Sequence, residues 1–545
     1  MVVRAASARS RHSPRPQTSQ ATVIPAPTLG VDARVSLASG DMSVCPYAYN
    51  IMPDKSGMRV RSGYREFVVD VESGTSFAIG TIIPLEGIEG TDDKLFAVTN
   101  EGIWDVTTYD TAPTLKVAFT ANTTADAGYG QFINYVNQAG AQFIYYADNL
   151  NGLWTYTVSS NTWAQTTNIT GLNETDICGI VVHKLRVWVF TRNSSSAFYL
   201  GVNSIVGAAT EFVFGGKFKR GGYVAGIYNW TLDGGAGVDD YLVVASSAGD
   251  ALTYQGEDPS ASSTWSIVGT YDIGAAPANY RAGIEYAGEL YILTGFGLVS
   301  MDEILRGANP QNPGTTELAF KIAKVIQQSM IELRDTRGWT PLFFPAEGLI
   351  IIISPAQTDG TYIQYVLDIT TRGWAYWRGL PIISAGVWQN KLYFGTSDDK
   401  IMIMDVFRDG LTIDPPASGA NGDPIEFSIL HSASDMGTPA VMKRGAFVRP
   451  NWRADYAPVY ESKVLYDYDL AEFSALLSQP VSSVGLWDTG VWNTATWGAG
   501  AATPWSVATG ASGIGRTLAI AIRGASTADT VLISTDVIWN RGGLL

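Results

Sequence analysis

Residues 386–404 read Gly-Val-Trp-Gln-Asn-Lys-Leu-Tyr-Phe-Gly-Thr-Ser-Asp-Asp-Lys-Ile-Met-Ile-Met, and this stretch contains the pattern that decides the fold. A short apolar run is followed by a polar turn, a second run begins at Leu392, and a third begins at Ile401. Short runs rich in β-branched and aromatic residues, separated by turn residues, are typical of antiparallel strands. The same order of glycine, strand, turn and strand recurs at 179–185 and 283–290. We therefore expect each of these segments to begin a small antiparallel sheet.

Paired apolar runs of this kind recur along residues 91–410 at a nearly constant spacing. The intervals between the first strong apolar positions are 48, 42, 57, 48, 59 and 43 residues, for Leu95, Phe143, Leu185, Leu242, Leu290, Leu349 and Leu392. Each interval has room for a four-stranded sheet, and repeats of this length bury their faces by stacking around an axis. The sequence predicts an all-β fold, a β-propeller of about seven blades, and the irregular intervals also allow six or eight.

Four segments flank or interrupt the predicted propeller. Residues 316–335 carry apolar residues at helical spacing and predict one helical insertion between blades. We expect residues 32–90 to be an N-terminal β segment leading into the propeller, and residues 411–417 to be a linker. Because long alternating runs follow the linker, we expect residues 418–545 to form a separate, C-terminal antiparallel β-domain.

Residues 1–31 are basic and rich in proline. They contain no acidic residue and four arginines, Arg4, Arg9, Arg11 and Arg15. Their prolines oppose a packed element, so we expect an extended N-terminal arm. Two roles stay open: a solvated tail, or an arm that docks on a partner or touches DNA.

The charge balance limits the classes of function. The chain has 36 Lys and Arg against 51 Asp and Glu, a formal net charge of −15. This argues against a protein that holds duplex DNA by neutralising phosphates, but it is compatible with a conduit that repels DNA as it passes. Charged residues make up 16% of the chain, against about 25% in ordinary globular proteins, which suggests that much surface is buried against other subunits.

Cysteine content and hydropathy indicate a chain that folds in a reducing cytoplasm. Cys45 and Cys178 are the two cysteines, so no disulfide framework is expected. The longest aliphatic run, Leu349–Ile353, is far shorter than the roughly 20 residues that span a bilayer. No apolar stretch of the secretory type follows the N-terminal arginines. We expect neither secretion nor membrane anchoring.

No residue is predicted to be catalytic, cofactor-binding or metal-binding. The histidines are His12 in the arm, His183 in a turn and His431 at the end of a strand, and we expect His183 to be solvated. The sequence contains no nucleophile elbow, zinc-protease, phosphate-loop or EF-hand motif. We expect a protein that is not an enzyme and has no cofactor. Glycoside hydrolysis stays open, because two suitably separated carboxylates leave no motif.

Aromatic residues form two notable patterns. Segments 151–163 and 362–374 resemble kelch strands whose aromatics close a blade, although the kelch double glycine is missing; core packing is favoured over a sugar-binding platform. A spacing of five residues matches neither a strand nor a helix. We expect the tryptophans at this spacing to anchor turns, packed beneath a loop rather than exposed to a cell envelope, at Trp487, Trp492 and Trp497.

Several short motifs also occur in one order along nearly the whole chain. They are Asn50-Ile-Met-Pro-Asp-Lys-Ser-Gly-Met-Arg-Val-Arg-Ser-Gly-Tyr64, Gly338-Trp339 with Phe344-Pro345, Thr370-Thr-Arg-Gly-Trp-Ala-Tyr-Trp377, Leu392-Tyr-Phe-Gly395, Lys443-Arg444, Arg449-Pro450, the Trp487 to Trp497 pattern and Gly542-Gly543. In this order they resemble the tail nozzle or packaged-DNA stabilisation proteins of short-tailed phages. The basic first 30 residues have no counterpart in that family.

The resemblance implies a structural subunit of the virion tail that is assembled in the host cytoplasm. It implies a homo-oligomer, a hexameric ring below the dodecameric adaptor of the head–tail connector. The channel of that ring would retain packaged genomic DNA and conduct it during ejection without sequence-specific binding. The resemblance also implies contacts with tail spikes, fibres or a needle. Because each copy is acidic, we expect a lumen that repels phosphate.

Two other functions are compatible with the same sequence. The first is a carbohydrate-binding or polysaccharide-degrading β-propeller of a phage tail, which would act on surface polysaccharide. The second is a soluble bacterial propeller that serves as an interaction scaffold and would be monomeric.

Overall fold

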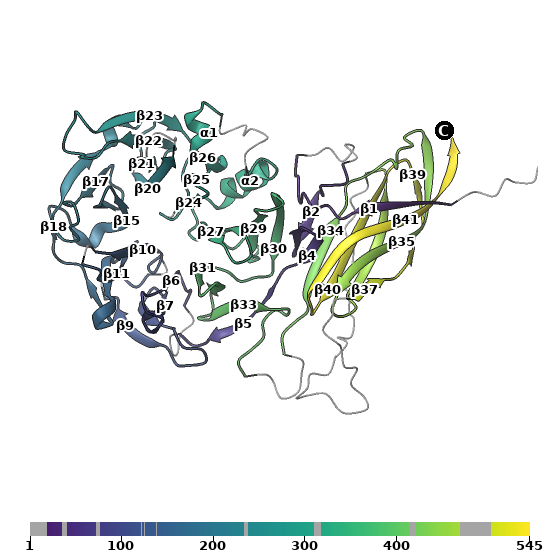
Figure 1. The fold of residues 1–545 in the computed structure, drawn as a ribbon, viewed down its shortest axis with the longest axis horizontal. Coiled ribbons are helices and arrows are strands. Elements are labelled where there is room, and N and C mark those ends of the chain that lie inside the picture. The colour runs from purple at the N-terminus through teal and green to yellow at the C-terminus, as the bar shows by residue number, and fades with distance from the viewer. Residues whose placement is uncertain are drawn as a thin grey trace, which may run out of the picture.

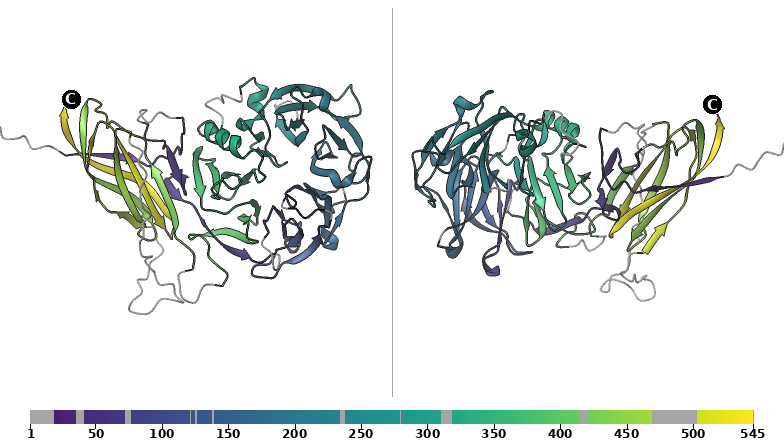
Figure 2. Two further views of the ribbon diagram at one scale, coloured as in Figure 1. Left: turned by 180° about the vertical axis from the view of Figure 1, so that it is seen from behind. Right: turned by 45° about the horizontal axis from the view of Figure 1, so that its top comes forward.

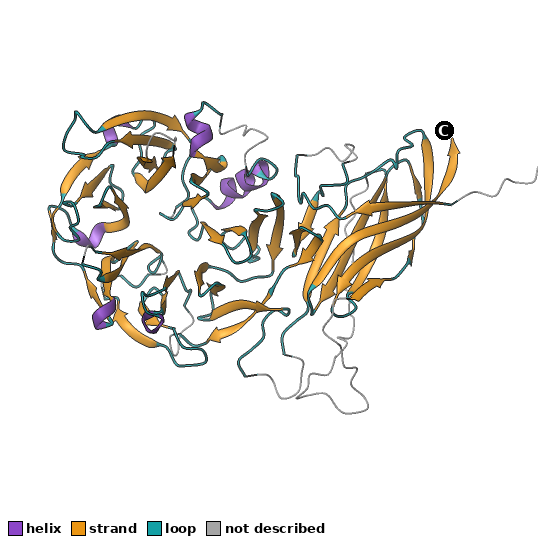
Figure 3. Ribbon diagram, viewed as in Figure 1, coloured by secondary structure: helices purple, strands orange, loops and turns teal. Residues whose placement is uncertain are grey.

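The computed structural model describes residues 19–34, 41–71, 77–120, 122–124, 126–137, 139–233, 238–278, 280–309, 318–414, 421–468 and 503–544. Strands make up nearly all of the regular secondary structure, with a few short helices (Figure 3). The strands build a ring of small sheets and, beside its rim, a two-sheet sandwich (Figure 1). The predicted all-β class is confirmed.

The ring is a β-propeller whose first four blades are four-stranded antiparallel sheets. Blade 1 contains β6 (Thr81–Leu85), β7 (Lys94–Val98), β8 (Gly102–Asp105) and β9 (Thr114–Ala118). Blade 2 contains β10 (Gly130–Val136), β11 (Gln142–Asp148), β12 (Gly152–Thr157) and β13 (Thr162–Gln165). Blade 3 contains β15 (Ile177–His183), β16 (Arg186–Thr191), β17 (Ser196–Tyr199) and β19 (Thr210–Val213). Blade 4 contains β20 (Val224–Asp233), β21 (Val238–Ser246), β22 (Asp250–Gln255) and β23 (Ser266–Asp272).

Three further units complete the ring. The fifth is a three-stranded sheet of β24 (Gly283–Tyr286), β25 (Glu289–Thr294) and β26 (Gly297–Ser300). The sixth contains β27 (Thr340–Phe344), β28 (Leu349–Ile353), β29 (Ile363–Asp368) and β30 (Gly373–Arg378). The last contains β31 (Ser384–Trp388), β32 (Lys391–Gly395), β33 (Ile401–Val406) and, from the N-terminal part of the chain, β5 (Gly63–Val68). Six blades are thus separate sheets, and the unit β27–β30 is one half of an eight-stranded sheet.

The first strands of the blades contact one another in sequence around the axis, and β31 of the last blade contacts β6 of the first. Six of the seven apolar positions that revealed the repeat lie in the second strand of a blade. The exception is Leu185, which is 63% exposed and lies with Lys184 at positive φ in the turn before β16. A two-residue hairpin turn with positive φ at both positions matches the strand twist, and it displaces this leucine from the core.

Strand β5 closes the propeller by pairing antiparallel with β33. The two strands lie more than 330 residues apart in the sequence, so the ring is held shut by the N-terminal part of the chain. The predicted description of residues 32–90 as a lead into the propeller is therefore incomplete. This segment also contributes β2 (Tyr47–Tyr49), β3 (Ile51–Asp54) and β4 (Gly57–Val60) to the sandwich.

The sandwich is built from both ends of the described chain. Its first sheet has the order β3-β4-β41-β35-β37, with β1 paired to β41 and with β38 and β39 paired to β35. Its second sheet has the order β2-β34-β40-β36. The remaining bounds are β1 (Gln20–Pro25), β34 (Ile425–Leu430), β35 (Val441–Ala454), β36 (Val459–Tyr466), β37 (Thr503–Ser506), β38 (Thr509–Gly510), β39 (Ile514–Gly515), β40 (Leu518–Ser526) and β41 (Thr530–Leu544).

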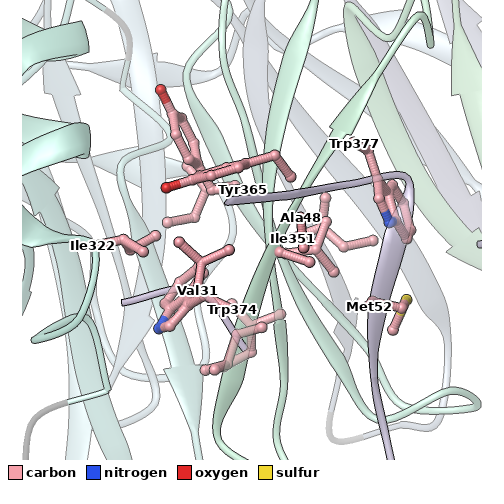
Figure 4. Packing of buried hydrophobic residues seen from close by; sticks show 14 of the residues in the cluster. Val31, Ala48, Met52, Ile322, Ile351, Tyr365, Trp374 and Trp377 are labelled. Atoms are coloured by element: carbon pink, nitrogen blue, oxygen red, sulfur yellow. The ribbon is translucent and has the colours of Figure 1, made fainter. Parts of the chain in front are cut away.

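Propeller and sandwich share one sheet and one core. Tyr49 of β2 pairs with Tyr376 of β30, which joins the sixth blade to the second sheet of the sandwich in a continuous eight-stranded sheet. The buried cluster at this junction contains Val31, Ile322, Trp374 and Trp377 (Figure 4) and extends to Trp452 between the sandwich sheets. The sandwich lies beside the propeller rim and not over its axis (Figure 2). The strands of the predicted C-terminal β-domain therefore share a sheet and a buried cluster with the propeller.

The described part of the N-terminal arm is packed. Residues 20–25 form β1, an edge strand on β41, and Ile24, Ala26 and Val31 are buried. Pro25 is tolerated because it is the last residue of an edge strand. One side of an edge strand has no neighbouring strand, so a missing N–H group on that side removes no hydrogen bond between strands. The four arginines, His12 and Trp487, Trp492 and Trp497 lie outside the described residues, as do residues 415–417 of the predicted linker.

The predicted helical insertion is present in a shorter form. Helix α2 (Ala323–Leu333) lies within the predicted 316–335, and a short helix α1 (Met301–Leu305) precedes it. The two helices contact β25 and β26 of the three-stranded blade. Ile331, which the sequence placed on the apolar face, is 76% exposed, whereas Ile326 and Met330 are buried.

Of the residues described, none belongs to a helix long and apolar enough to cross a membrane.

Short elements complete the structure. The two-residue strands β14 (Ile169–Thr170) and β18 (Gly207–Ala208) pair in parallel. Single 3-10 turns are η1 (Gly90–Asp92), η2 (Val158–Ser160), η3 (Glu174–Asp176) and η4 (Gly215–Lys217).

Candidate functional site at the propeller axis

The two described histidines are buried, which corrects the expectation that His183 is solvated. Nδ1 of His183 lies 2.6 Å from Oδ1 of Asn229, and its ring packs edge-on against Trp265. Burial lowers the pKa of His183, because the charged ring would lose its hydration. His431 is 1% exposed, neither ring nitrogen has a described hydrogen-bond partner, and burial lowers its pKa to about 4. Both histidines are therefore neutral core residues.

The buried His431 makes a testable prediction about pH. In the unfolded chain this histidine has a pKa of about 6.5 and is protonated below that pH. In the folded protein its pKa is about 4, so it stays neutral until the pH falls to about 4. Between pH 6.5 and 4 the unfolded state therefore binds one more proton than the folded state. The stability that the neutral His431 contributes above pH 6.5 is lost as the pH falls toward 4. We expect the free energy of unfolding of the wild type, relative to His431→Met, to fall by up to about 1.4 kcal/mol per pH unit in this window. Urea unfolding of both proteins at several pH values measures the difference, and parallel pH curves would contradict it.

The cysteines and the kelch-like aromatics belong to the core. Cys45 and Cys178 are free and buried, and burial raises the pKa of the Cys178 thiol to about 12. In blade 2, Tyr156 and Trp163 pack on each other and on Phe96 of blade 1. Core packing, the interpretation favoured from the sequence, is thus confirmed for these aromatics.

The segments that lead into the first strands of the blades meet across the axis. Arg281, two residues before β24 of the fifth blade, donates from Nη2 to the carbonyl oxygen of Gly80, just before β6 of the first blade, at 3.1 Å. Gln131 of β10 donates from its side-chain amide to the carbonyl oxygen of Tyr280. Blade 5 is adjacent to neither blade 1 nor blade 2, so these bonds bridge the axis.

A second arginine makes a similar crossing. Arg337 leads into β27 and forms an ion pair with Asp126, which leads into β10, with 3.2 Å between Nε and Oδ1. Its Nη1 also donates to the carbonyl oxygen of Asp126 at 3.1 Å. Tyr280 lies between, with its ring packed edge-on against Phe190 of blade 3. We call Arg281, Tyr280 and Arg337 together the axial plug, because their bonds bridge the propeller axis.

Two cavities adjoin the residues of the axial plug. One of about 510 Å³ lies on the side of Arg337 and Arg192, and is lined also by Asn193, Tyr223 and Thr336. Another of about 240 Å³ lies between the first strands of blades 2 to 5 and is lined by Gln131, Tyr228, Asn229, Arg281 and Glu285. Both cavities therefore adjoin residues of the axial plug: Arg281 lines the smaller, and Tyr280 and Arg337 line the larger.

Carboxylates near the axis offer limited acid–base chemistry. Burial raises the pKa of Glu285, which is the one carboxylate among the described residues lining the narrower cavity. In the larger cavity, Asp126 and Asp335 each pair with an arginine. Outside the axis, burial raises the pKa of Glu289 to about 7, and its Oε1 accepts a bond from the backbone N–H of Asp302. In the described ranges, no group of three or more His, Cys, Asp or Glu could hold a metal ion.

Sequence reasoning did not find the axial plug. Its arginines are single residues in loops and belong to no motif. The available signal was their place in the repeat, because each stands just before the first strand of a blade, where lead-in segments converge on the axis.

No family model and no curated protein matches the chain. Among solved structures, the computationally designed Ika8 protein is 8% identical, with 63% of this chain and 100% of that chain covered and a TM-score of 0.35. BBS1N, solved in complex with ARL6DN, is 10% identical, with 64% and 98% covered and a TM-score of 0.39. The extracellular domain of a hybrid two-component system from B. thetaiotaomicron is 12% identical, with 64% and 40% covered and a TM-score of 0.34. Likenesses this weak carry no argument about function.

Proposed function

We propose that the protein is a structural subunit of a phage tail nozzle. The observation that carries the proposal is the continuous eight-stranded sheet that fuses the propeller to the sandwich. A shared sheet and core make the two parts one rigid body, and a ring subunit needs such a body to present two different faces at fixed angles. The ordered motifs along the chain support the same function.

In this nozzle, DNA passes between subunits and not through a propeller. The major groove of B-DNA alone is about 12 Å wide, so a duplex needs a channel wider than this. The propeller axis is crossed by the bonds of Arg281 and Gln131, and the adjoining cavities are about 240 and 510 Å³. In this proposal DNA does not pass through any single propeller, and the conduit is the lumen enclosed by several copies of the chain.

Exposed apolar side chains offer surfaces for such an assembly. They lie on outermost blade strands, as with Val213 of β19 and Val268 of β23, and on the sandwich sheet, as with Val23 of β1 and Phe447 of β35. Contacts between different surfaces of successive copies close into a ring when the rotation allows it. The outward Arg444, Arg449 and Arg453 of β35 would lie away from a lumen that repels phosphate.

Native mass spectrometry of the full-length protein tests the proposal, alone and mixed with the adaptor–portal complex of the same genome. We expect six copies of the 58.5 kDa chain on the adaptor ring. A chain that stays monomeric and does not bind the complex would contradict the nozzle function.

One observation favours a second candidate, a carbohydrate-binding or polysaccharide-degrading propeller. The polar cavity of about 510 Å³ combines tyrosine, asparagine and arginine side chains, a composition suited to sugars. Incubation with host capsule and lipopolysaccharide separates the two candidates. Depolymerisation would support the second, and its absence together with assembly on the adaptor would support the nozzle.

A further inference from the structure

One side of the sandwich is an open sheet that carries exposed apolar side chains. We call it the outer sheet face, made of the outward side chains of β1, β35, β39 and β41. Four large apolar residues on it are between 44% and 63% exposed: Val23, Phe447, Ile514 and Ile533. They occupy neighbouring rows, because Val23 pairs with Asp536 of β41, and Phe447 pairs with Ile538 of the same strand. Apolar side chains gathered on one exposed face mark an interaction surface.

Arginine side chains stand among these apolar residues. Exposed and buried residues alternate along β35, which places three arginines on the outer sheet face: Arg444, Arg449 and Arg453. Strands β1, β35 and β41 contain one carboxylate, Asp536, and it pairs with Arg449 at 2.6 Å. Three arginines against one aspartate leave this face with a charge of +2.

The loop between β6 and β7 has the opposite charge. Residues 86–93 contain no cation and four acidic residues: Glu86, Glu89, Asp92 and Asp93. Glu86 and Asp93 accept hydrogen bonds from Gln389 of the last blade, but none of the four forms an ion pair among the described residues. Ile88, within this loop, is 70% exposed. The loop therefore combines an apolar side chain with negative charge, as the outer sheet face combines apolar side chains with positive charge.

The neighbouring cations do not neutralise the loop. Lys94 and Lys116 lie near the same carboxylate, with 3.9 and 3.5 Å between their Nζ atoms and Oδ2 of Asp105. The four acidic residues and Asp105 against these two lysines leave a net charge of −3.

The two surfaces cannot meet within one molecule. Strands β35 and β41 form the end of the sandwich, whereas β6 and β7 belong to blade 1 of the propeller (Figure 1). The outer sheet face also points away from the second sheet, which is the sheet that joins the propeller. A contact between the face and the loop therefore connects two copies. Because it joins two different surfaces, it can be repeated from copy to copy and close into a ring.

We propose that the outer sheet face of one copy binds loop 86–93 of the next copy. Phe447 and Ile88 lie at the centre of this contact, and the arginines of β35 face the carboxylates of the loop around them. Apolar burial supplies the affinity, and the complementary charges select the partner surface and fix its register. The inference rests on the ring proposed above and assigns the contact between its subunits.

Charge reversal of the two surfaces tests the contact. The face variant is Arg444→Glu with Arg453→Glu, and the loop variant is Glu89→Arg with Asp92→Arg, which leaves the residues bonded to Gln389 in place. Each variant alone brings like charges together, so we expect its assembly to be at least about tenfold weaker than that of the wild type.

An equal mixture of the two variants should assemble again. The acidic face of one variant then meets the basic loop of the other, and the basic face of the second meets the acidic loop of the first. Recovery in the mixture also shows that both variants fold. Native mass spectrometry with the adaptor–portal complex counts the copies bound in each sample.

Arg306→Glu with Lys324→Glu is the matched control. It reverses two exposed cations beside and within the propeller helices, changes the net charge by the same amount as the face variant, and should assemble as the wild type does. If the face variant or the loop variant assembled like the wild type, if the mixture did not recover, or if the control also failed, the contact would be overturned and the nozzle proposal would stand. Duplex DNA that bound the wild type but not the face variant would instead make nucleic acid the occupant of the face. A wild type that stayed monomeric beside the adaptor would overturn both proposals.

Discussion

Asp409→Asn should destabilise the protein by about 3–5 kcal/mol, the usual loss when one partner of a buried ion pair is removed. Arg61 is 2% exposed and lies where the chain crosses from β4 of the sandwich to β5 of the propeller. Its guanidinium group donates to both carboxylate oxygens of Asp409, at 2.8 and 2.6 Å, and to Oδ1 of Asn50 at 3.0 Å. The asparagine keeps the shape but removes the charge, so Arg61 would stay buried without compensation.

The same Asn50 makes the effect large, because it ties three segments together. Its Nδ2 donates to the carbonyl oxygens of Arg378 in β30 and Glu426 in β34, and its Oδ1 accepts from the N–H of Arg378. Polar networks in a low-dielectric interior lose more than one bond when a member is removed. We expect propeller and sandwich to unfold together at a lower urea concentration.

Asp529→Asn is the matched control for this prediction. Asp529 pairs with Arg59, two residues from Arg61, at 2.8 Å, but the two side chains are 37% and 41% exposed. Exposed pairs contribute about 0.2–1 kcal/mol, so the control should unfold almost as the wild type does. Urea unfolding followed by tryptophan fluorescence measures all three proteins. If the two variants lost the same free energy of unfolding, burial of the Arg61–Asp409 ion pair would not increase its contribution to stability.

The sequence predicted the parts of the fold that depend on neighbouring residues. Strand, turn and second strand are close in the chain, so the repeat was visible in Leu95, Leu290 and Leu392, which lie in the second strands of their blades. Short-range patterns of this kind specify hairpins. The propeller followed from counting them.

The remainder of the fold depends on pairings between distant segments. Nothing local in Gly63–Val68 indicates that it pairs with Ile401–Val406, and nothing in Gln20–Pro25 indicates a strand on β41. Residues 418–545 therefore looked like a separate domain, although their sheets need β1 to β4 for completion. The axial plug is missing from the sequence analysis for the same reason, since Arg281 and Gly80 meet only when the ring closes.

Trp374→Ala should destabilise the protein by about 3–5 kcal/mol, the usual cost of truncating a buried tryptophan. Trp374 of β30 is 0% exposed, and its indole Nε1 donates to the carbonyl oxygen of Leu318 at 2.7 Å. Its backbone carbonyl accepts from the N–H of Val31, so it also holds the N-terminal segment on the propeller (Figure 4). The alanine would leave a cavity and an unpaired carbonyl in the core that both parts share.

Trp505→Ala separates the role of burial from that of the indole hydrogen bond. Trp505 of β37 also donates from Nε1 to a backbone carbonyl, that of Ala454 at 3.1 Å, but it is 37% exposed. Its loss should cost about 1 kcal/mol, the net contribution of one hydrogen bond. Thermal unfolding of both variants measures the contrast. If Trp374→Ala cost no more than Trp505→Ala, the junction would not be part of the common core, and the argument for one rigid subunit would lose its basis.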